Sequence, residues 1–371
     1  MRNVYGVADN IFSPLGLNTR SNMEALIKGH SGIHQHSAGI SPEPFYAALL
    51  PPKEKQPSGS LSAFEQIVYR SAKDAMTLAS LDPVNKKTGF ILSTTKGNIS
   101  QIENLSEKYT EDRLSLNSSA TIIAESLGIR TEALVVSHAC ISGLLAIITG
   151  MRLIQAGSYD HLVIAGGDLI TSFIYSGFRS FQAISSSPCR PFDASRDGIS
   201  LGEAAATIIL SAEKKDGAVR ISGGSVSNDA NHISGPSRTG EELWLAIRRA
   251  MEQAGKNATQ IDFISAHGTA TRYNDEMEAK AFHLANLHMV PTNSLKGYYG
   301  HTLGAAGILE SVVTIQSMKE NIVLPTLGYS TPGTEMPIHI VKELKRETLN
   351  TCLKTASGFG GCNASIVMEK T

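Results

Sequence analysis

The chain has 371 residues, of which 42% are hydrophobic and 18% are charged, and its formal net charge at pH 7 is −1. This size and composition are typical of a globular protein with two domains of ordinary size. The near-neutral charge gives no overall positive field that would hold nucleic acid or an anionic membrane. No stretch resembles a signal peptide or a membrane span, so we expect a cytoplasmic protein without a membrane span or a nucleic-acid partner.

The chain contains four cysteines: Cys140, Cys189, Cys352 and Cys362. They are too few for a disulfide scaffold in a chain of this length and lack the spacing of a metal site, so we expect reduced thiols and no metal. His30, His34 and His36 lie close together in a polar segment. Because no carboxylate or cysteine joins them, a solvated loop is favoured over a metal site there.

Apolar periodicity in the first half of the chain predicts alternating strands and helices. We expect strands at 4–7, 89–93, 133–136, 161–167 and 204–210. We expect helices at 18–27, 64–78, 118–127 and 143–154, and loops at 32–57 and 172–187. A strand, a helix and a strand in this order are typical of a parallel sheet with crossover helices.

The charged, glycine-ended segment 213–217 separates two apolar strands and predicts a boundary between halves 1–214 and 215–371. In the second half we expect strands at 219–221, 261–265, 291–295, 352–356 and 364–369, and helices at 242–254, 275–286 and 303–319. A strand, a turn and a helix rich in small residues occur at 134–155 and again at 290–318. This weak repeat suggests duplicated halves packed about a pseudo-twofold axis, with Cys140 and His301 at related helix starts facing one cleft.

Cys140 lies where the predicted strand 133–136 turns into the apolar helix 143–154. The backbone holds a thiol firmly at such a place, the helix N-terminus favours the thiolate, and free N–H groups can bind an oxyanion. Small neighbours at 139, 142 and 143 leave room for an acyl chain. On position alone, a nucleophile and a buried structural cysteine are both open interpretations.

Two histidines follow predicted strands in glycine-bordered motifs. His267 lies in Ala-His-Gly-Thr-Ala-Thr at 266–271, and His301 lies in the segment 296–307, which begins with Lys296. Ligand crevices of α/β sheets lie beyond such strand ends, and glycine lets backbone or substrate approach closely. Two histidines in matched settings, together with Cys140, favour a catalytic site over isolated structural histidines.

These motifs resemble those of the elongating beta-ketoacyl-acyl carrier protein synthases, which are decarboxylating condensing enzymes of the thiolase fold. Further matching motifs lie at 163–167, 190–193, 196–198, 201–203 and 358–361, in the family's order. The resemblance implies an α/β, thiolase-like fold in which duplicated αβ halves form a five-layered αβαβα sandwich. It also implies that Cys140 is the nucleophile, that His267 and His301 are the catalytic histidines, and that Lys296 is a supporting lysine.

Two more positions match the family. Glu310 matches a buried acidic residue that organises the site, and Phe359 matches the aromatic gate, whose N–H joins that of Cys140 in the oxyanion hole. Three features depart from the family. Segment 32–64 lacks the usual basic stretch, Ser357 stands where phenylalanine is common, and Ile141 follows the nucleophile where a smaller residue is usual.

The resemblance implies condensation of an acyl-cysteine with malonyl-acyl carrier protein to give 3-oxoacyl-acyl carrier protein and carbon dioxide, in fatty-acid or related polyene or polyketide synthesis. It implies no cofactor, because the substrates are carried on the phosphopantetheine of acyl carrier protein, and a dimer with an identical or a different partner chain. Two alternatives stay open: a thiolase-type acyl-coenzyme A acyltransferase, and a non-catalytic partner subunit. A thiolase needs a second cysteine, for which Cys362 is placed, whereas a non-catalytic subunit lacks the nucleophile.

Overall fold

The computed structural model describes residues 2–37, 39–103, 111–230 and 233–371. Its main sheet has ten strands in the order β11-β10-β14-β15-β9-β1-β8-β6-β4-β5. An antiparallel pairing of β1 (Tyr5–Phe12) with β9 (Val219–Asn228) joins the strands of the first half to those of the second. The sheet is therefore continuous across the two halves of the chain.

The two halves of this sheet have the same topology. Numbered along the chain within each half, the strands lie in the order 1-5-4-2-3 in β1-β8-β6-β4-β5 and again in β9-β15-β14-β10-β11. In each half the pairs 2-3 and 2-4 are parallel and the pairs 4-5 and 5-1 are antiparallel. The strands are β4 (Thr88–Ser93), β5 (Leu134–Val136), β6 (His161–Asp168), β8 (Ala204–Ser211), β10 (Phe263–Ser265), β11 (Thr292–Asn293), β14 (Thr351–Gly358) and β15 (Cys362–Lys370).

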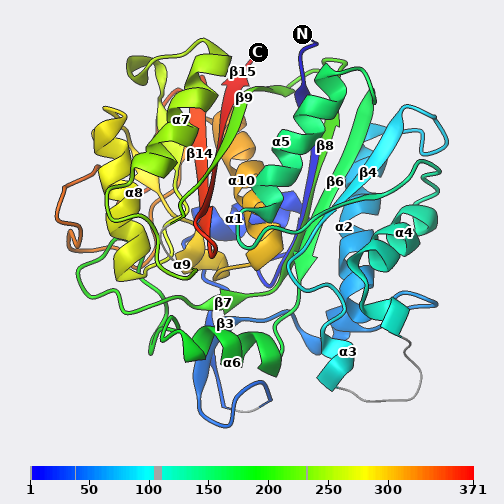
Figure 1. Cartoon of the computed structure of the whole chain (residues 1–371), viewed down its shortest axis with the longest axis horizontal. Helices are drawn as coiled ribbons and strands as arrows, with labels where there is room; N and C mark the ends of the chain where they lie inside the picture. Colours follow the sequence, from blue (N-terminus) through cyan, green and yellow to red (C-terminus); the bar gives the residue numbers. More distant parts are fainter. Residues whose placement is uncertain (1, 38, 104–110, 231–232) are drawn as a thin grey trace.

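Helices and the sheet halves form five layers (Figure 1). Helices α5 (Ser142–Gln155) and α10 (Ala306–Glu320) lie between the two halves of the sheet and contact both. The outer layers are α2 (Ala63–Ala79) with α4 (Leu116–Ser126), and α7 (Glu241–Ala254) with α8 (Arg272–Leu284). This is the αβαβα sandwich that the resemblance implied.

The two central helices cross at glycines. A Cβ atom on Gly307 would lie 2.3 Å from the backbone nitrogen of Leu144, and one on Gly143 would lie 2.8 Å from that of Ile308. Only hydrogen at both positions allows the backbones to come this close. The crossing brings the starts of α5 and α10 together, and with them the segments that carry Cys140 and His301.

Two segments predicted as loops contain regular structure. Segment 32–57 forms β2 (His34–His36), β3 (Phe45–Ala48) and a 3-10 turn (Pro52–Lys55), and β3 pairs with β7 (Leu201–Gly202). Segment 172–187 contains α6 (Ser172–Ser180), whose N-terminus is capped by the Thr171 side chain. The loop predictions were wrong because tertiary packing of buried side chains outweighs the poor local propensity of both segments.

The remaining elements are short or peripheral. They are α1 (Thr19–Ile27), α3 (Ser100–Glu103), α9 (Lys296–Tyr299), β12 (Ile322–Val323), β13 (Lys345–Arg346) and 3-10 turns at Glu111–Leu114, Ala258–Gln260 and Leu303–Ala305. The predicted strand at 133–136 is a half-buried edge strand rather than a buried one. Within the described residues, no helix combines the length and apolarity needed to cross a membrane.

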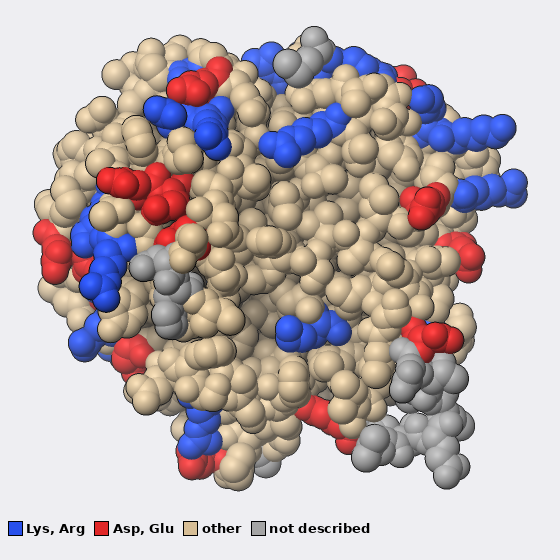
Figure 2. All heavy atoms as spheres, in the orientation of Figure 1, with Lys and Arg blue, Asp and Glu red and all other residues tan. Residues whose placement is uncertain are grey.

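Charged side chains are mixed on the face of the molecule seen in Figure 2. Basic residues predominate along its upper and upper-right margin, basic and acidic residues are mixed at the left, and most of its centre is uncharged. The centre of this face therefore carries no extended field of one sign.

Candidate active site

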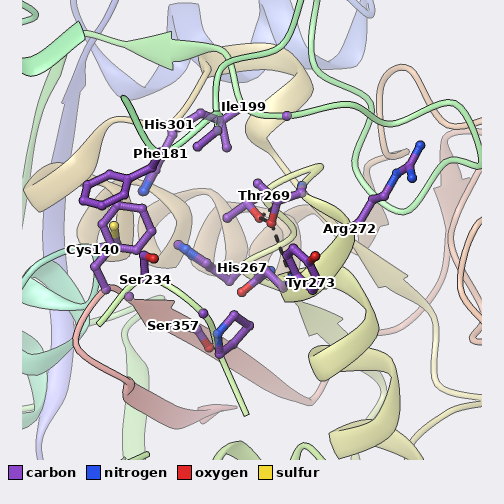
Figure 3. A pocket seen from close by; sticks show the side chains of 18 of the residues that line it. Cys140, Phe181, Ile199, Ser234, His267, Thr269, Arg272, Tyr273, His301 and Ser357 are labelled. Carbon is purple, nitrogen blue, oxygen red and sulfur yellow. Dashed lines mark hydrogen bonds between the residues drawn. The ribbon is translucent and has the colours of Figure 1, made fainter. Parts of the chain in front are cut away.

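Cys140, His267 and His301 converge in the structure. One ligand atom of each, the cysteine sulfur or a ring nitrogen, lies within 4.8 Å of the other two, and all three side chains are buried. They line a cavity of about 600 Å³, where Figure 3 shows them close together. The structure thus brings together the three residues that the sequence assigned to catalysis.

A tight turn places Cys140 between β5 and α5. Ala139 has a positive φ of 46°, a conformation that is strained for a residue with a side chain. The Ser142 hydroxyl stabilises the turn, because it accepts a hydrogen bond from the His138 N–H (2.7 Å) and donates one to the Ala139 carbonyl (2.6 Å). The backbone therefore fixes where the Cys140 sulfur points.

Burial raises the pKa of the Cys140 thiol to about 12, and the neighbouring Cys362 raises it further, whereas Lys296 and the Phe359 N–H act in the opposite direction. Burial therefore favours the neutral thiol in the resting protein and opposes the effect of the helix start, which favours the thiolate. Loss of hydration outweighs the helix dipole here, because the dipole is a small effect and the sulfur has little access to water. At rest the site holds a neutral thiol.

Backbone contacts fix the loop that carries His267, directly after β10. A Glu278 carboxylate oxygen accepts from the His267 N–H (2.8 Å), the other accepts from the Gly268 N–H (2.6 Å), and Lys296 Nζ donates to the His267 carbonyl (3.1 Å). Lys296 Nζ also lies 3.5 Å from Nδ1 of the His267 ring. Because an ammonium faces Nδ1, the ring proton is placed on Nε2.

His301 enters the site from the turn after α9. Its N–H donates to the Ser200 carbonyl (2.7 Å), and its carbonyl accepts from the Gly202 N–H (3.0 Å). Neither ring nitrogen has a hydrogen-bond partner among the described residues, although the ring is buried. The ring meets that of His267 edge to face, with centroids 5.2 Å apart, so its nitrogens are available to a substrate.

Both imidazoles are held in the neutral form. Burial lowers the pKa of His267 well below its usual value, and the charges of Lys296, His301 and Lys354 lower it further. Burial likewise lowers the pKa of His301, with Lys296 and Lys354 adding to the effect. Two neutral imidazoles offer N–H donors without adding positive charge to a buried site.

Lys296 and Glu310 form a buried ion pair beside the histidines. Lys296 Nζ donates to a Glu310 carboxylate oxygen at 2.5 Å, and neither side chain is appreciably exposed. The pair lies between the segment before His301 and helix α10. The structure therefore places Lys296 next to His267 and Glu310 against Lys296.

Phe359 follows β14 and faces the cavity rather than the core. Its ring stacks on Phe178 (centroids 5.5 Å apart) and meets Phe181 edge to face (5.3 Å), and its N–H donates to the Cys140 sulfur. The preceding residue, Gly358, packs closely against the Cys140 backbone, since a Cβ on Gly358 would lie 3.0 Å from the Cys140 nitrogen. One residue thus contributes an aromatic wall and an N–H donor directed at the sulfur.

Three buried charged residues of the site were not predicted from the sequence. Asp168 accepts from the Gly304 N–H (2.8 Å) and the Thr94 hydroxyl (2.8 Å), which links β6 to the turn before α10. Glu278 and Lys354 hold the backbone of the loop that carries His267, the first through N–H groups and the second through carbonyls. For Asp168 and Lys354 the available signal was a charge inside an otherwise apolar strand, which requires a buried partner. Glu278 lies in a helix with several other charged residues and gave no such signal.

The open end of the cavity is polar. Thr269 and Thr271 line it and share a hydrogen bond of 2.9 Å between their hydroxyls, while exposed Arg272 and Tyr273 lie farther from Cys140 (Figure 3). These side chains come from the segment between β10 and α8. The cavity therefore runs from a polar opening to a buried thiol.

Among the described residues, Cys140, His267 and His301 are also the one group of three side chains with metal-ligand geometry. A metal requires the thiolate form of cysteine. Burial raises the pKa of the Cys140 thiol, so the sulfur would have to lose its proton before it could bind a metal ion. The same three groups suit chemistry in which the thiol loses its proton only during reaction.

Comparisons with known proteins agree with this site. Residues 1–216 match the beta-ketoacyl synthase N-terminal domain, and residues 218–330 match the C-terminal domain of that family. The chain is 28% identical to 3-oxoacyl-[acyl-carrier-protein] synthase 2 of Vibrio cholerae, over 100% of this chain and 99% of that one. It is 33% identical to the tetracenomycin polyketide synthase ketoacyl synthase alpha subunit of Streptomyces glaucescens, over 67% of this chain and 62% of the relative.

Solved structures show the same fold. The structure titled "The ishigamide ketosynthase/chain length factor" matches with a TM-score of 0.91 at 23% identity, over 100% of this chain and 99% of that chain. A beta-ketoacyl synthase from Burkholderia phymatum matches with a TM-score of 0.88 at 24% identity, over 100% of both. The thiolase-like fold is therefore confirmed, and the chain belongs to the beta-ketoacyl synthase family of acyltransferase-type condensing enzymes.

Proposed function

We propose that this chain catalyses a decarboxylating Claisen condensation, in which an acyl group on Cys140 reacts with malonyl-acyl carrier protein. The observation that carries this proposal is one buried thiol beside two neutral imidazoles at the end of a single cavity. The products are 3-oxoacyl-acyl carrier protein and carbon dioxide.

In the first half-reaction, the Cys140 thiol attacks the thioester of an acyl carrier protein. The N–H groups of Cys140 and Phe359 stabilise the oxyanion. A free ring nitrogen of His301 accepts the thiol proton and passes it to the sulfur of the departing carrier. The carrier leaves as a thiol, and the acyl group stays on Cys140, so protons and charge balance.

In the second half-reaction, a malonyl thioester loses carbon dioxide, and negative charge develops on its thioester oxygen. His267 and His301 each direct one N–H at that oxygen. The resulting enolate carbon attacks the acyl thioester of Cys140, and the sulfur leaves and takes up a proton. Loss of one such donor typically lowers the rate about a hundredfold or more.

The reaction as proposed needs no cofactor, because the phosphopantetheine of acyl carrier protein carries both substrates. The polar opening lined by Thr269 and Thr271 suits the amide groups of such an arm. One solved relative is titled as a type II polyketide acyl carrier protein in complex with its ketosynthase. Free thiols at all four cysteines agree with a cytoplasmic location.

We propose that the chain acts as a dimer, either with a second copy or with a related chain. Two solved neighbours are titled as ketosynthases with a chain length factor, which supports the second form. A non-catalytic role for this chain is disfavoured by Cys140, which lies against both histidines. A thiolase role is disfavoured because a second histidine, His301, lies in the site beside Cys140 and His267.

The test replaces Cys140 by alanine and supplies radiolabelled malonyl-acyl carrier protein with an acyl-carrier donor. We expect Cys140→Ala to abolish 3-oxoacyl product and to leave no acyl group on the protein by intact mass. Cys352→Ala is the matched control, since this cysteine is also fully buried but lies outside the cavity. Undiminished chain extension by Cys140→Ala would rule out the proposal.

A further inference from the structure

Lys354 is a charged residue in the interior of β14. Its side chain is 0% exposed. Its Nζ donates to the carbonyls of Thr355 (2.6 Å), Ala266 (3.1 Å) and Ser265 (3.2 Å), and lies 2.7 Å from a Glu310 carboxylate oxygen. Four oxygens thus surround one ammonium group, which is the environment that a buried cation requires.

Two of the three carbonyls that Lys354 holds belong to Ser265 and Ala266, the two residues before His267. Ser265 pairs with Lys354 at the end of the parallel register between β10 and β14, so pairing with β14 stops there, while the Ala266 N–H still donates to the Asn293 carbonyl of β11 (2.8 Å). Where the pairing of β10 with β14 ends, the Lys354 ammonium holds the chain through its hydrogen bonds to the Ser265 and Ala266 carbonyls. It thereby sets the direction in which the chain leaves β10 toward the imidazole.

The opposite side of the same loop is held by Glu278. This carboxylate accepts from the N–H groups of His267 and Gly268 and from the Thr355 hydroxyl (3.0 Å). Lys354 and Thr355 are neighbours on β14. Through Lys354 the strand contacts the loop carbonyls, and through Thr355 it contacts Glu278. The backbone around His267 is therefore fixed by buried charges of both signs.

Lys354 also shares Glu310 with Lys296. One Glu310 oxygen is 2.5 Å from Lys296 Nζ, and the other is 2.7 Å from Lys354 Nζ. The two contacts hold both oxygens of the carboxylate in place. They thereby fix the ammonium of Lys296, which in turn lies 3.5 Å from Nδ1 of His267.

We propose that Lys354 is a positioning residue for decarboxylation. Its buried ammonium fixes the backbone of the His267 loop and, through Glu310, the contact between Lys296 and the His267 ring. This inference rests on the proposed function, because it assigns His267 to the decarboxylation step. Lys354 touches no reacting atom, so its loss should impair decarboxylation more than acylation of Cys140.

The test compares Lys354→Ala and Lys354→Met with the parent protein. Carbon dioxide release from malonyl-acyl carrier protein reports the second half-reaction, and intact mass reports acylation of Cys140. We expect kcat for decarboxylation to fall about ten- to hundredfold, as for other residues that orient catalytic groups indirectly, with KM and acylation changed only about twofold. Lys370→Met, a lysine that holds a carbonyl far from the cavity, should match the parent.

Chemical rescue separates positioning from stability. Ammonium ions should restore much of the lost rate of Lys354→Ala, because they fit the space left by Nζ, whereas tetramethylammonium should not. If the alanine variant does not fold by circular dichroism, Lys354→Met must still show the selective loss of decarboxylation.

Three results would overturn the assignment: an unchanged decarboxylation rate, an equal loss of acylation and decarboxylation, or a folded Lys354→Ala variant that ammonium does not restore. A parent protein that releases no carbon dioxide would instead contradict the proposed function itself. The two failures are therefore distinguishable.

Discussion

At the scale of single residues, the site keeps its reacting groups uncharged. The thiol of Cys140 has a raised pKa and both histidines have lowered ones. The charged groups do not belong to these three residues but to their neighbours Lys296 and Lys354 and to the Glu310 carboxylate that both lysines contact. The cavity can therefore receive a malonyl anion without a resident ion pair competing for the imidazole donors.

The lowered histidine pKa values predict a pH effect on stability. The folded chain keeps His267 and His301 neutral, whereas the unfolded chain protonates them below about pH 6.5. The unfolded state then binds more protons, so the free energy of unfolding falls as the pH drops. Between about pH 7.5 and 5.5 each histidine should contribute a loss of about 1.4 kcal/mol.

Urea unfolding at both pH values measures this effect. His301→Asn should reduce the loss by about 1.4 kcal/mol relative to the parent, whereas His30→Asn, at an exposed position, should not change it. An identical pH dependence in the parent and His301→Asn would mean that His301 is not held neutral by the fold.

The residues of the site differed in how well the sequence predicted them. Cys140, His267 and His301 each follow a strand and are bordered by small residues, a pattern that local sequence shows. The roles of Lys354 and Glu278 were not predicted, because they depend on contacts between segments far apart in the chain. The protonation state of Cys140 was also out of reach, since it depends on burial, which only the assembled fold determines.

At the scale of elements, the crossing of α5 and α10 fixes the geometry of the site. The sequence predicted both helices, because each is a long apolar segment, but it gave no crossing point. The sequence also missed α6, since its serines and glycine are weak helix formers. That omission hid the stacking of Phe178 on Phe359 and the edge-to-face contact of Phe181 with it.

The helix crossing predicts that Gly307→Ala will be destabilising. Its methyl group would collide with the backbone of α5 near Leu144, and rigid backbone cannot move aside as a side chain can. We expect a loss of about 1–3 kcal/mol in the free energy of unfolding, measured by urea denaturation.

Gly177→Ala is the matched control for this prediction, because a Cβ there has no atom within 4 Å and the residue also lies in a helix. It should be neutral or slightly stabilising, since alanine favours helix more than glycine does. Equal stability of the two variants would show that α5 and α10 do not cross as closely as described.

At the scale of the whole molecule, the site is assembled from both halves. Cys140 comes from the first half, and His267 and His301 come from the second. The hydrophobic core between them is one continuous cluster that includes side chains of α5 and of α10. The repeated strand order explains this arrangement, because each half places the start of its central helix, α5 or α10, at the boundary between the two halves.

This arrangement predicts that the chain can be divided in the exposed segment 213–217 without loss of the site. Coexpressed fragments 1–215 and 216–371 should copurify and retain condensation activity, because each exposes an apolar face that only the other covers. Either fragment alone should be inactive and prone to aggregate. Fragments that stay soluble but do not associate would contradict a shared core.

The double role of Phe359 has a consequence for how this enzyme could be altered. Its ring forms part of the aromatic wall with Phe178 and Phe181, while its peptide N–H points at the Cys140 sulfur. A rotation about its own side-chain bonds would move the ring in the cavity wall and leave the amide in place. A shift of its main chain would move the ring and the amide together, so the shape of the cavity can be altered without changing the amide only through the first kind of movement.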